Sequence, residues 1–220
     1  MKRSALGIAA CAAIVLTCAL APAQASATVL CNANTTPCPV PYGAGTQIQA
    51  ALPAMTTTVI ESALGNVTCL ENKIKMKSTA EGGSGLSVPV RVSELVFGQC
   101  TIPAGGGGTE SCTVTAVNLG PLEEEQWIGF FEKGVNGNGA FSITMSELGS
   151  FGFSVFCKGK VECTLTAVLN STVTGGLGGA ATITGAQKMS RAGAKCPPAD
   201  PTWKFKWNVS EPANFFLVAE

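Results

Sequence analysis

The chain has 220 residues, with 14 basic side chains, 14 acidic side chains and no histidine. The missing histidine excludes a Ser-His-Asp triad, a Cys-His dyad and an H-E-x-x-H metal motif. Asp200 is the single aspartate, which also excludes a calcium loop rich in Asp ligands. Basic and acidic residues are equal in number and the sequence has no run of basic residues, which argues against a nucleic-acid partner. No pattern in the chain predicts a cofactor.

The N-terminus has the three parts of an export signal. Lys2 and Arg3 are positive, Leu6–Leu20 is almost wholly apolar, and Ala25-Ser26-Ala27 forms an A-x-A cleavage site. We therefore predict a signal peptide over residues 1–27 and a mature chain that starts at Thr28. No later apolar stretch approaches the ~20 residues of a membrane span, so none is expected after cleavage. The Ala-rich signal is typical of bacteria.

Two alternatives at the N-terminus stay open. Ala21-Pro22-Ala23 is a second cleavage site, and Cys11 or Cys18 would carry the lipid if the protein were a lipoprotein. Both cysteines leave with the signal if cleavage precedes Thr28. We predict a protein that is secreted into the medium or associated with the cell wall, with a lipoprotein as the alternative.

The mature chain is expected to have two parts. Residues 28–45 form a loop-like segment pinned by Cys31 and Cys38, and residues 46–220 form one β-domain with a soft boundary near 118–122. Abundant Gly, Thr, Ser and Val with few charged residues are typical of an exported β-protein.

Alternation of apolar and polar residues predicts strands, because successive side chains of a strand point to opposite faces. Alternating runs occupy 87–93, 141–146, 151–157, 161–167 and 203–209, and 215–219 is typical of a final strand. Glycine-rich breaks at 82–85, 105–108, 134–139 and 175–179 separate strands, with Asn-Gly turn signals at 136–139. The fold predicted is all-β: a single antiparallel β-sandwich or barrel stapled by disulfides, with little or no helix.

Residues 121–133 allow two interpretations. Pro121 and the glutamates that follow suit the first turn of a helix, whereas Gly129 and the two phenylalanines after it suit an irregular strand. The cluster Glu123, Glu124, Glu125 and Glu132 would supply the carboxylate pair of a glycoside hydrolase. A solvated surface stretch is the simpler interpretation.

Eight cysteines lie beyond the signal, and an even count in an exported chain predicts four disulfides. They are Cys31, Cys38, Cys69, Cys100, Cys112, Cys157, Cys163 and Cys196. A zinc site is disfavoured because the chain has no C-x-x-C pair and no histidine. The pairing we favour joins 31 with 38, 69 with 100 across a hairpin, 157 with 163 around Lys158-Gly159-Lys160, and 112 with 196. The main alternative pairs Cys100 with Cys112.

The aromatic residues give few surface candidates. Trp203 and Trp207 share a predicted strand face with Phe205, which is typical of a core strand rather than a sugar-stacking platform. Trp127 and Tyr42 are freer candidates for surface contact. The loops 102–111 and 132–140 are predicted to form the contact surface, because binding residues concentrate on loops.

Three segments read GNVTC (Gly65–Cys69), SELVFGQC (Ser93–Cys100) and CTVTAVNL (Cys112–Leu119). This pattern resembles uncharacterised secreted proteins of actinobacteria and their relatives, in which a segment like LCNANTTPCP (Leu30–Pro39) often accompanies it. The resemblance implies export, a bacterial source, a β-rich fold and a cysteine framework, but no activity and no site residue. The set often has Leu-Pro-Trp after the last motif, whereas here residues 120–126 precede Trp127.

These features predict an exported, non-enzymatic module with a structural, adhesive or ligand-binding role. Its partner would be a cell-wall glycan or another surface protein. One alternative is a secreted carbohydrate-active hydrolase that uses a Glu pair. The other is a disulfide-stabilised inhibitor that acts through one rigid exposed loop, such as the loop at 105–108.

Overall fold

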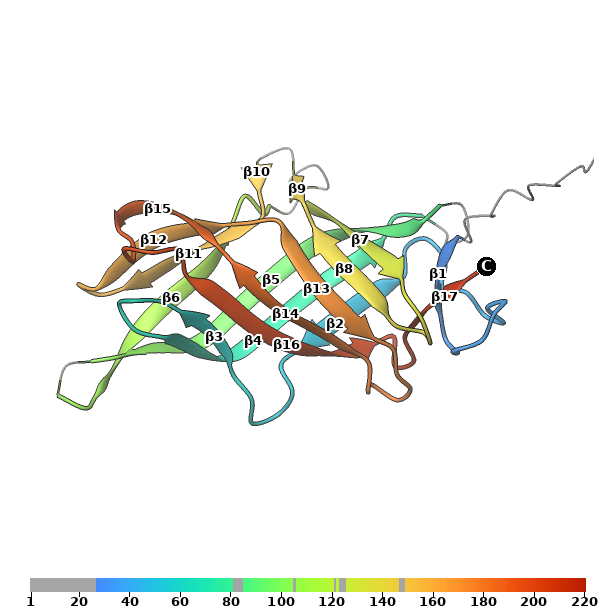
Figure 1. Cartoon of the computed structure of the whole chain (residues 1–220), viewed down its shortest axis with the longest axis horizontal. Coiled ribbons are helices and arrows are strands. Elements are labelled where there is room, and N and C mark those ends of the chain that lie inside the picture. The colour runs from blue at the N-terminus through green and yellow to red at the C-terminus, as the bar shows by residue number, and fades with distance from the viewer. Residues whose placement is uncertain (1–26, 81–84, 105, 121, 123–125, 147–148) are drawn as a thin grey trace, which may run out of the picture.

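The structure is a computed structural model that describes residues 27–80, 85–104, 106–120, 122, 126–146 and 149–220 (Figure 1). The predicted signal with Cys11 and Cys18, and the glutamates 123–125, lie outside the described residues. Within the described ranges the fold is all-β and antiparallel, as predicted, and it is the barrel rather than the sandwich. The part of the chain described here contains no helix that is long and apolar enough to cross a membrane.

Eight strands close the barrel, because β4 and β5 pair with each other as well as with their neighbours. In order around the barrel they are β5 (Ser87–Pro103), β7 (Trp127–Lys133), β8 (Gly139–Ile143), β13 (Leu169–Thr174), β14 (Thr182–Lys188), β16 (Thr202–Glu211), β2 (Gln47–Ala51) and β4 (Val67–Ser78). In Figure 1, β13, β14 and β16 cross the near face of this barrel.

The long strands β4 and β5 continue past the barrel and carry an extension at one end, on the left in Figure 1. Five further strands build it: β3 (Thr58–Glu61), β6 (Thr109–Val117), β11 (Gly152–Cys157), β12 (Val161–Thr166) and β15 (Ser190–Lys195). Strand β3 pairs with both β4 and β16, while β6, β11, β12 and β15 follow β5 in turn. The extension therefore shares β4, β5 and β16 with the barrel.

Two small sheets complete the chain. At the opposite end, β1 (Thr28–Cys31) pairs with β17 (Phe216–Ala219), and Cys31 is bonded to Cys38. Strands β9 (Met145–Ser146) and β10 (Gly149–Ser150) form the other pair. The N-terminal segment is thus attached to the last strand of the chain through backbone pairing.

The core follows the alternation that predicted the strands. On β16 the side chains of Trp203, Phe205, Trp207 and Val209 are buried, while Lys204 and Lys206 are exposed. The prediction that Trp203 and Trp207 belong to the core is confirmed. Trp127 is fully buried against Phe151, with ring centroids 4.7 Å apart, so the expectation of a surface role for it was wrong.

Residues 127–133 form strand β7, so the strand interpretation of this stretch is confirmed for its described part. Trp127 and Phe131 point inward from it, and Gly129 lies between them on the same face. A Cβ at Gly129 would approach the Phe141 ring and the Ser142 carbonyl oxygen to 2.9 Å each. The glycine that argued against a helix therefore makes room for close packing between β7 and β8.

Four disulfides are present, as predicted, but two of the predicted pairings were wrong. Cys31–Cys38 and Cys69–Cys100 are confirmed, whereas Cys112 pairs with Cys157 and Cys163 with Cys196. The reason is register: β11 and β12 do form a hairpin, but Cys157 lies opposite Val161 in it. On its other edge Cys157 lies opposite Cys112 of β6. The alternative partners Cys100 and Cys112 also lie opposite each other, yet Cys100 is bonded to Cys69 on β4.

Candidate functional site

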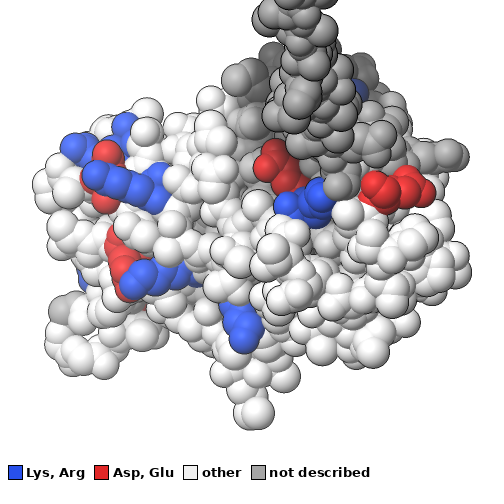
Figure 2. Space-filling view, turned by 45° about the vertical axis from the view of Figure 1, so that its right-hand side comes forward, with Lys and Arg blue, Asp and Glu red and all other residues white. Residues whose placement is uncertain are grey.

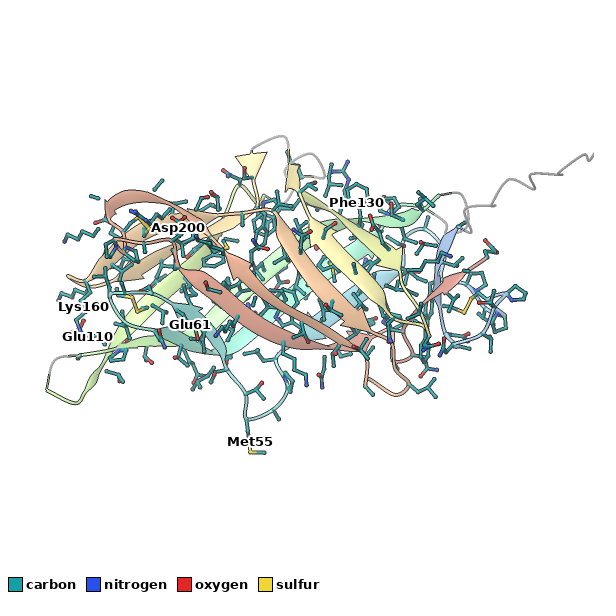
Figure 3. All side chains as sticks on the ribbon, in the orientation of Figure 1. Met55, Glu61, Glu110, Phe130, Lys160 and Asp200 are labelled. Carbon is teal, nitrogen blue, oxygen red and sulfur yellow. A yellow bond between two sulfur atoms is a disulfide. The ribbon has the colours of Figure 1, made fainter. Side chains whose placement is uncertain are left out.

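The loops predicted as one contact surface lie at opposite ends of the molecule. The loop between β5 and β6 projects from the far end of the extension, and the turn between β7 and β8 lies at the β1–β17 end (Figure 1). Lys160 holds the base of the first loop through a hydrogen bond from Nζ to the Pro103 carbonyl oxygen (2.7 Å), beside Glu110 (Figure 3). The two loops therefore do not form one continuous contact surface.

The turn between β7 and β8 also supports the neighbouring strands. The Leu217 N–H donates to the Gly137 carbonyl oxygen (3.0 Å), and Asn34 Nδ2 donates to the Asn136 carbonyl oxygen (3.1 Å). The Gly175 N–H donates to Asn138 Oδ1 (3.0 Å). Glu132, the one described member of the predicted acidic cluster, is exposed at the end of β7, opposite Ser87 and Ala140.

An open groove of about 700 Å³ lies on the outer surface of β13, β14 and β16, and we name it the β13–β16 groove. Its rim is polar and consists of Thr57, Asn170, Thr172, Thr184, Lys204 and Lys206. Its floor is formed mainly by Val59, Gly185 and Ala186, and the buried Phe205 lies behind Gly185. An apolar floor inside a ring of hydroxyl, amide and ammonium groups is the usual composition of a ligand site.

The groove exists because β13 and β14 separate there. Their pairing runs from Thr174 opposite Thr182 to Thr172 opposite Thr184 and then stops. Two residues further along β13, the Asn170 N–H donates to the side-chain Oε1 of Gln187 (3.2 Å) instead of to a backbone carbonyl. Beyond this point the chain of β14 continues into β15, which pairs with β12. The wall of the barrel therefore has a seam at the groove.

Gly185 leaves this part of the floor without a side chain, and the Phe205 ring packs against it from inside the barrel. It lies opposite Phe205, and a Cβ at Gly185 would come within 2.5 Å of Phe205 Cζ. The Phe205 ring in turn packs against Trp203 and Trp207, at centroid distances of 4.4 and 4.2 Å. Alternation in 203–209 predicted the inward ring, but the groove beside Gly185 depends on where the distant strand β13 stops pairing with β14.

The groove carries positive charge at its rim. Lys204 Nζ is 2.7 Å from Glu61 Oε1, so its charge is balanced by a neighbouring carboxylate. Lys206 has no ion pair among the described residues. Elsewhere, on the face shown in Figure 2, basic side chains lie mostly beside acidic ones, with broad uncharged areas between them. Lys206 is thus an uncompensated cation at the edge of a cavity.

A second groove of about 460 Å³ lies between β5 and β6, where β5 exchanges β7 for β6 as its neighbour. Val96, Ala116 and Leu119 are among its lining residues, with Glu94 beside them. Both oxygens of Glu94 are already engaged, by Lys73 at 2.8 Å and by Lys75 at 2.6 Å. This groove therefore presents fewer uncommitted polar groups than the β13–β16 groove.

The three segments that carry the sequence resemblance come together on adjacent strands. Cys69 of β4 lies opposite Cys100 of β5, which lies opposite Cys112 of β6. Comparisons of the chain with family models, with curated proteins and with solved structures give no match. The resemblance to secreted actinobacterial proteins therefore stays a prediction.

Proposed function

We propose that the protein is an exported, non-enzymatic module that binds a carbohydrate ligand in the β13–β16 groove. The observation that carries the proposal is the composition of this groove: an apolar floor at Val59, Gly185 and Ala186 inside a rim of hydroxyl, amide and ammonium groups. A sugar ring presents apolar C–H faces and polar hydroxyl edges, so it matches such a site on both counts.

Two further features support export and a binding role. Four disulfides fit an oxidising compartment. The groove is built on strands of a closed barrel, so its side chains are positioned by paired backbone instead of by free loops. A cell-wall glycan of the host is the ligand that suits a secreted or wall-associated bacterial protein, which is the setting we propose.

The proposal is tested by filling the groove. Ala186 is exposed on β14 and lines the floor, so Ala186→Trp places a bulky ring in the cavity without disturbing the core. Ala194→Trp, at an exposed position of β15 in the extension, is the matched control. Titration of purified wall glycans, followed by calorimetry, should show binding to the wild type and to Ala194→Trp and its loss in Ala186→Trp.

Two results would contradict the proposal. Equal binding by both variants would place the ligand elsewhere on the molecule. Release of new reducing ends from a bound glycan would show hydrolysis, and alanine substitution of Glu123, Glu124, Glu125 and Glu132 would then test whether the predicted acidic cluster is responsible.

A further inference from the structure

We infer that the ligand of the β13–β16 groove is a polysaccharide of uronic acids, held with its carboxylate at the Lys206 ammonium and its sugar ring over Gly185 and Ala186. This inference rests on the proposed function and adds the chemical class of the ligand. Three features of the groove support it: the charge balance of its lysines, the register that places Lys206 near the floor, and the hydrogen-bonding groups on the opposite rim.

The charges of the two lysines in the groove favour a ligand with one negative charge per bound sugar. Lys204 is paired with Glu61, while Lys206 has no ion pair among the described residues. An unpaired ammonium at the edge of a cavity favours an anionic ligand, because its charge there attracts the anion at close range. A neutral sugar would leave this cation without a partner when the ligand covers it.

Strand register places the cation next to the floor. Lys206 lies directly opposite Thr184, and the next pair on the same outer face is Lys204 opposite Ala186. Ala186 is thus a diagonal neighbour of Lys206, at about 7 Å, a distance that one pyranose ring with its substituents can span. A ring resting on the floor therefore brings a substituent of that same ring within reach of the Lys206 side chain.

The short distance between the floor of the groove and Lys206 favours a carboxylate over a phosphodiester. The carboxylate of a uronic acid is bonded to the sugar ring itself, so ring and charge enter the site as one unit. A phosphodiester lies between the units of a polymer and separates charge from ring. Asn170 and Thr172, on the opposite rim, are exposed and offer an amide and a hydroxyl to the hydroxyl groups of the sugar.

The inference is tested with four polymers: polygalacturonate, its fully methyl-esterified form, dextran, and poly(glycerol phosphate). The protein variants are wild type, Lys206→Gln and Lys188→Gln. Lys188 is the matched control, because it is exposed on β14, has no ion pair among the described residues and lies outside the groove lining. Thermal melting of each variant checks that the fold is intact.

We expect the wild type to bind polygalacturonate with an affinity that falls as salt is added. Methyl esterification or Lys206→Gln should each weaken binding about fivefold, whereas Lys188→Gln should change it less than about twofold. Equal binding of the acid and its ester, equal effects of the two lysine variants, or tighter binding of poly(glycerol phosphate) would overturn the inference.

The two proposals fail differently. Binding of dextran that Ala186→Trp abolishes and Lys206→Gln leaves unchanged would contradict the acidic ligand and support the carbohydrate site. Absence of binding to all four polymers and to purified wall glycans would contradict both proposals.

Discussion

Trp207 Nε1 donates a hydrogen bond to Asn72 Oδ1 at 2.6 Å inside the barrel, between two strands that are not neighbours. Strand β2 lies between β16, which carries Trp207, and β4, which carries Asn72. Asn72 Nδ2 donates in turn to the Val96 carbonyl oxygen of β5 (2.9 Å). One buried amide therefore joins three strands across the interior and satisfies the indole of a core tryptophan.

Replacing this amide should destabilise the barrel. Asn72→Ala leaves the Trp207 indole N–H without its acceptor in a fully buried position. We expect the free energy of unfolding to fall by about 1–3 kcal/mol, which is the usual penalty for an unsatisfied buried polar group. Urea unfolding followed by tryptophan fluorescence measures the loss. Gln47→Ala, an exposed position on β2, should change stability by less than about 0.5 kcal/mol and is the control; similar losses in both variants would contradict the role of Asn72.

The disulfide pattern predicts a specific peptide map. Lys158 and Lys160 lie between Cys157 and Cys163, so trypsin separates these two cysteines. Cys100 and Cys112 share the tryptic peptide 92–133, so a digest of the unreduced protein should contain this peptide linked to two others, through Cys69–Cys100 and through Cys112–Cys157. A separate peptide pair should be linked through Cys163 and Cys196. Mass spectrometry before and after reduction identifies both. A linked pair that contains Cys157 and Cys163 would disprove the register of β6, β11 and β12.

The cysteines show which features of the fold can be predicted from sequence patterns and which cannot. The alternation in 161–167 and 203–209 predicted β12 and β16, because a two-residue period is a local property of a strand. Disulfide partners depend on register between strands, and a hairpin loop of a few residues does not fix which cysteine lies opposite which. The confirmed pairs lie on a local loop and on a hairpin in which the two cysteines are opposed. The pair Cys112–Cys157 joins strands 45 residues apart.

The β13–β16 groove could not be predicted from the sequence, because it also depends on how distant strands pair. Gly185 is an ordinary glycine in an alternating strand, and the groove beside it arises where β13 leaves β14. That separation follows from the pairing of β15 with β12, which no local pattern encodes. Lys206 was visible as an outward residue of 203–209, but its lack of an ion pair depends on which acidic residues surround it in space. Trp127 was misplaced because the residues before it interrupt the alternation.

Glu94 should make a pH-dependent contribution to stability. Hydrogen bonds from Lys73 and then Lys75 lower the pKa of this carboxyl below its ordinary value of 4.5, against a weaker opposing effect of burial. A carboxyl whose pKa is lower in the folded state stabilises the fold above its unfolded pKa. The contribution is lost as the pH falls through the folded pKa. Glu94→Gln should therefore reduce stability at pH 7 by less than about 1 kcal/mol, because the ion pairs lie at the surface.

The pH test compares this variant with the wild type. Urea unfolding between pH 7 and pH 2 should show the difference in stability shrinking as the pH falls below the ordinary pKa of a glutamate. Glu211→Gln is the control, because Glu211 accepts a hydrogen bond from Gln49 and has no ion pair among the described residues. A difference for Glu94→Gln that persists unchanged at pH 2 would contradict the ion-pair explanation.

Gly185→Ala tests the packing that forms the floor of the groove. The added Cβ would lie 2.5 Å from Phe205 Cζ, and the ring cannot move freely because Trp203 and Trp207 contact it. We expect a loss of about 1–3 kcal/mol in the free energy of unfolding, the usual cost of overpacking a core, together with a change in tryptophan emission. Gly43→Ala is the matched control, because nothing lies within 4 Å of a Cβ at that position.

Because the conflict is with the Phe205 ring itself, Phe205→Leu should relieve part of it. The double variant Gly185→Ala, Phe205→Leu should then be more stable than the sum of the two single losses implies. Additive losses in the free energy of unfolding would show that a side chain at position 185 does not conflict with the Phe205 ring.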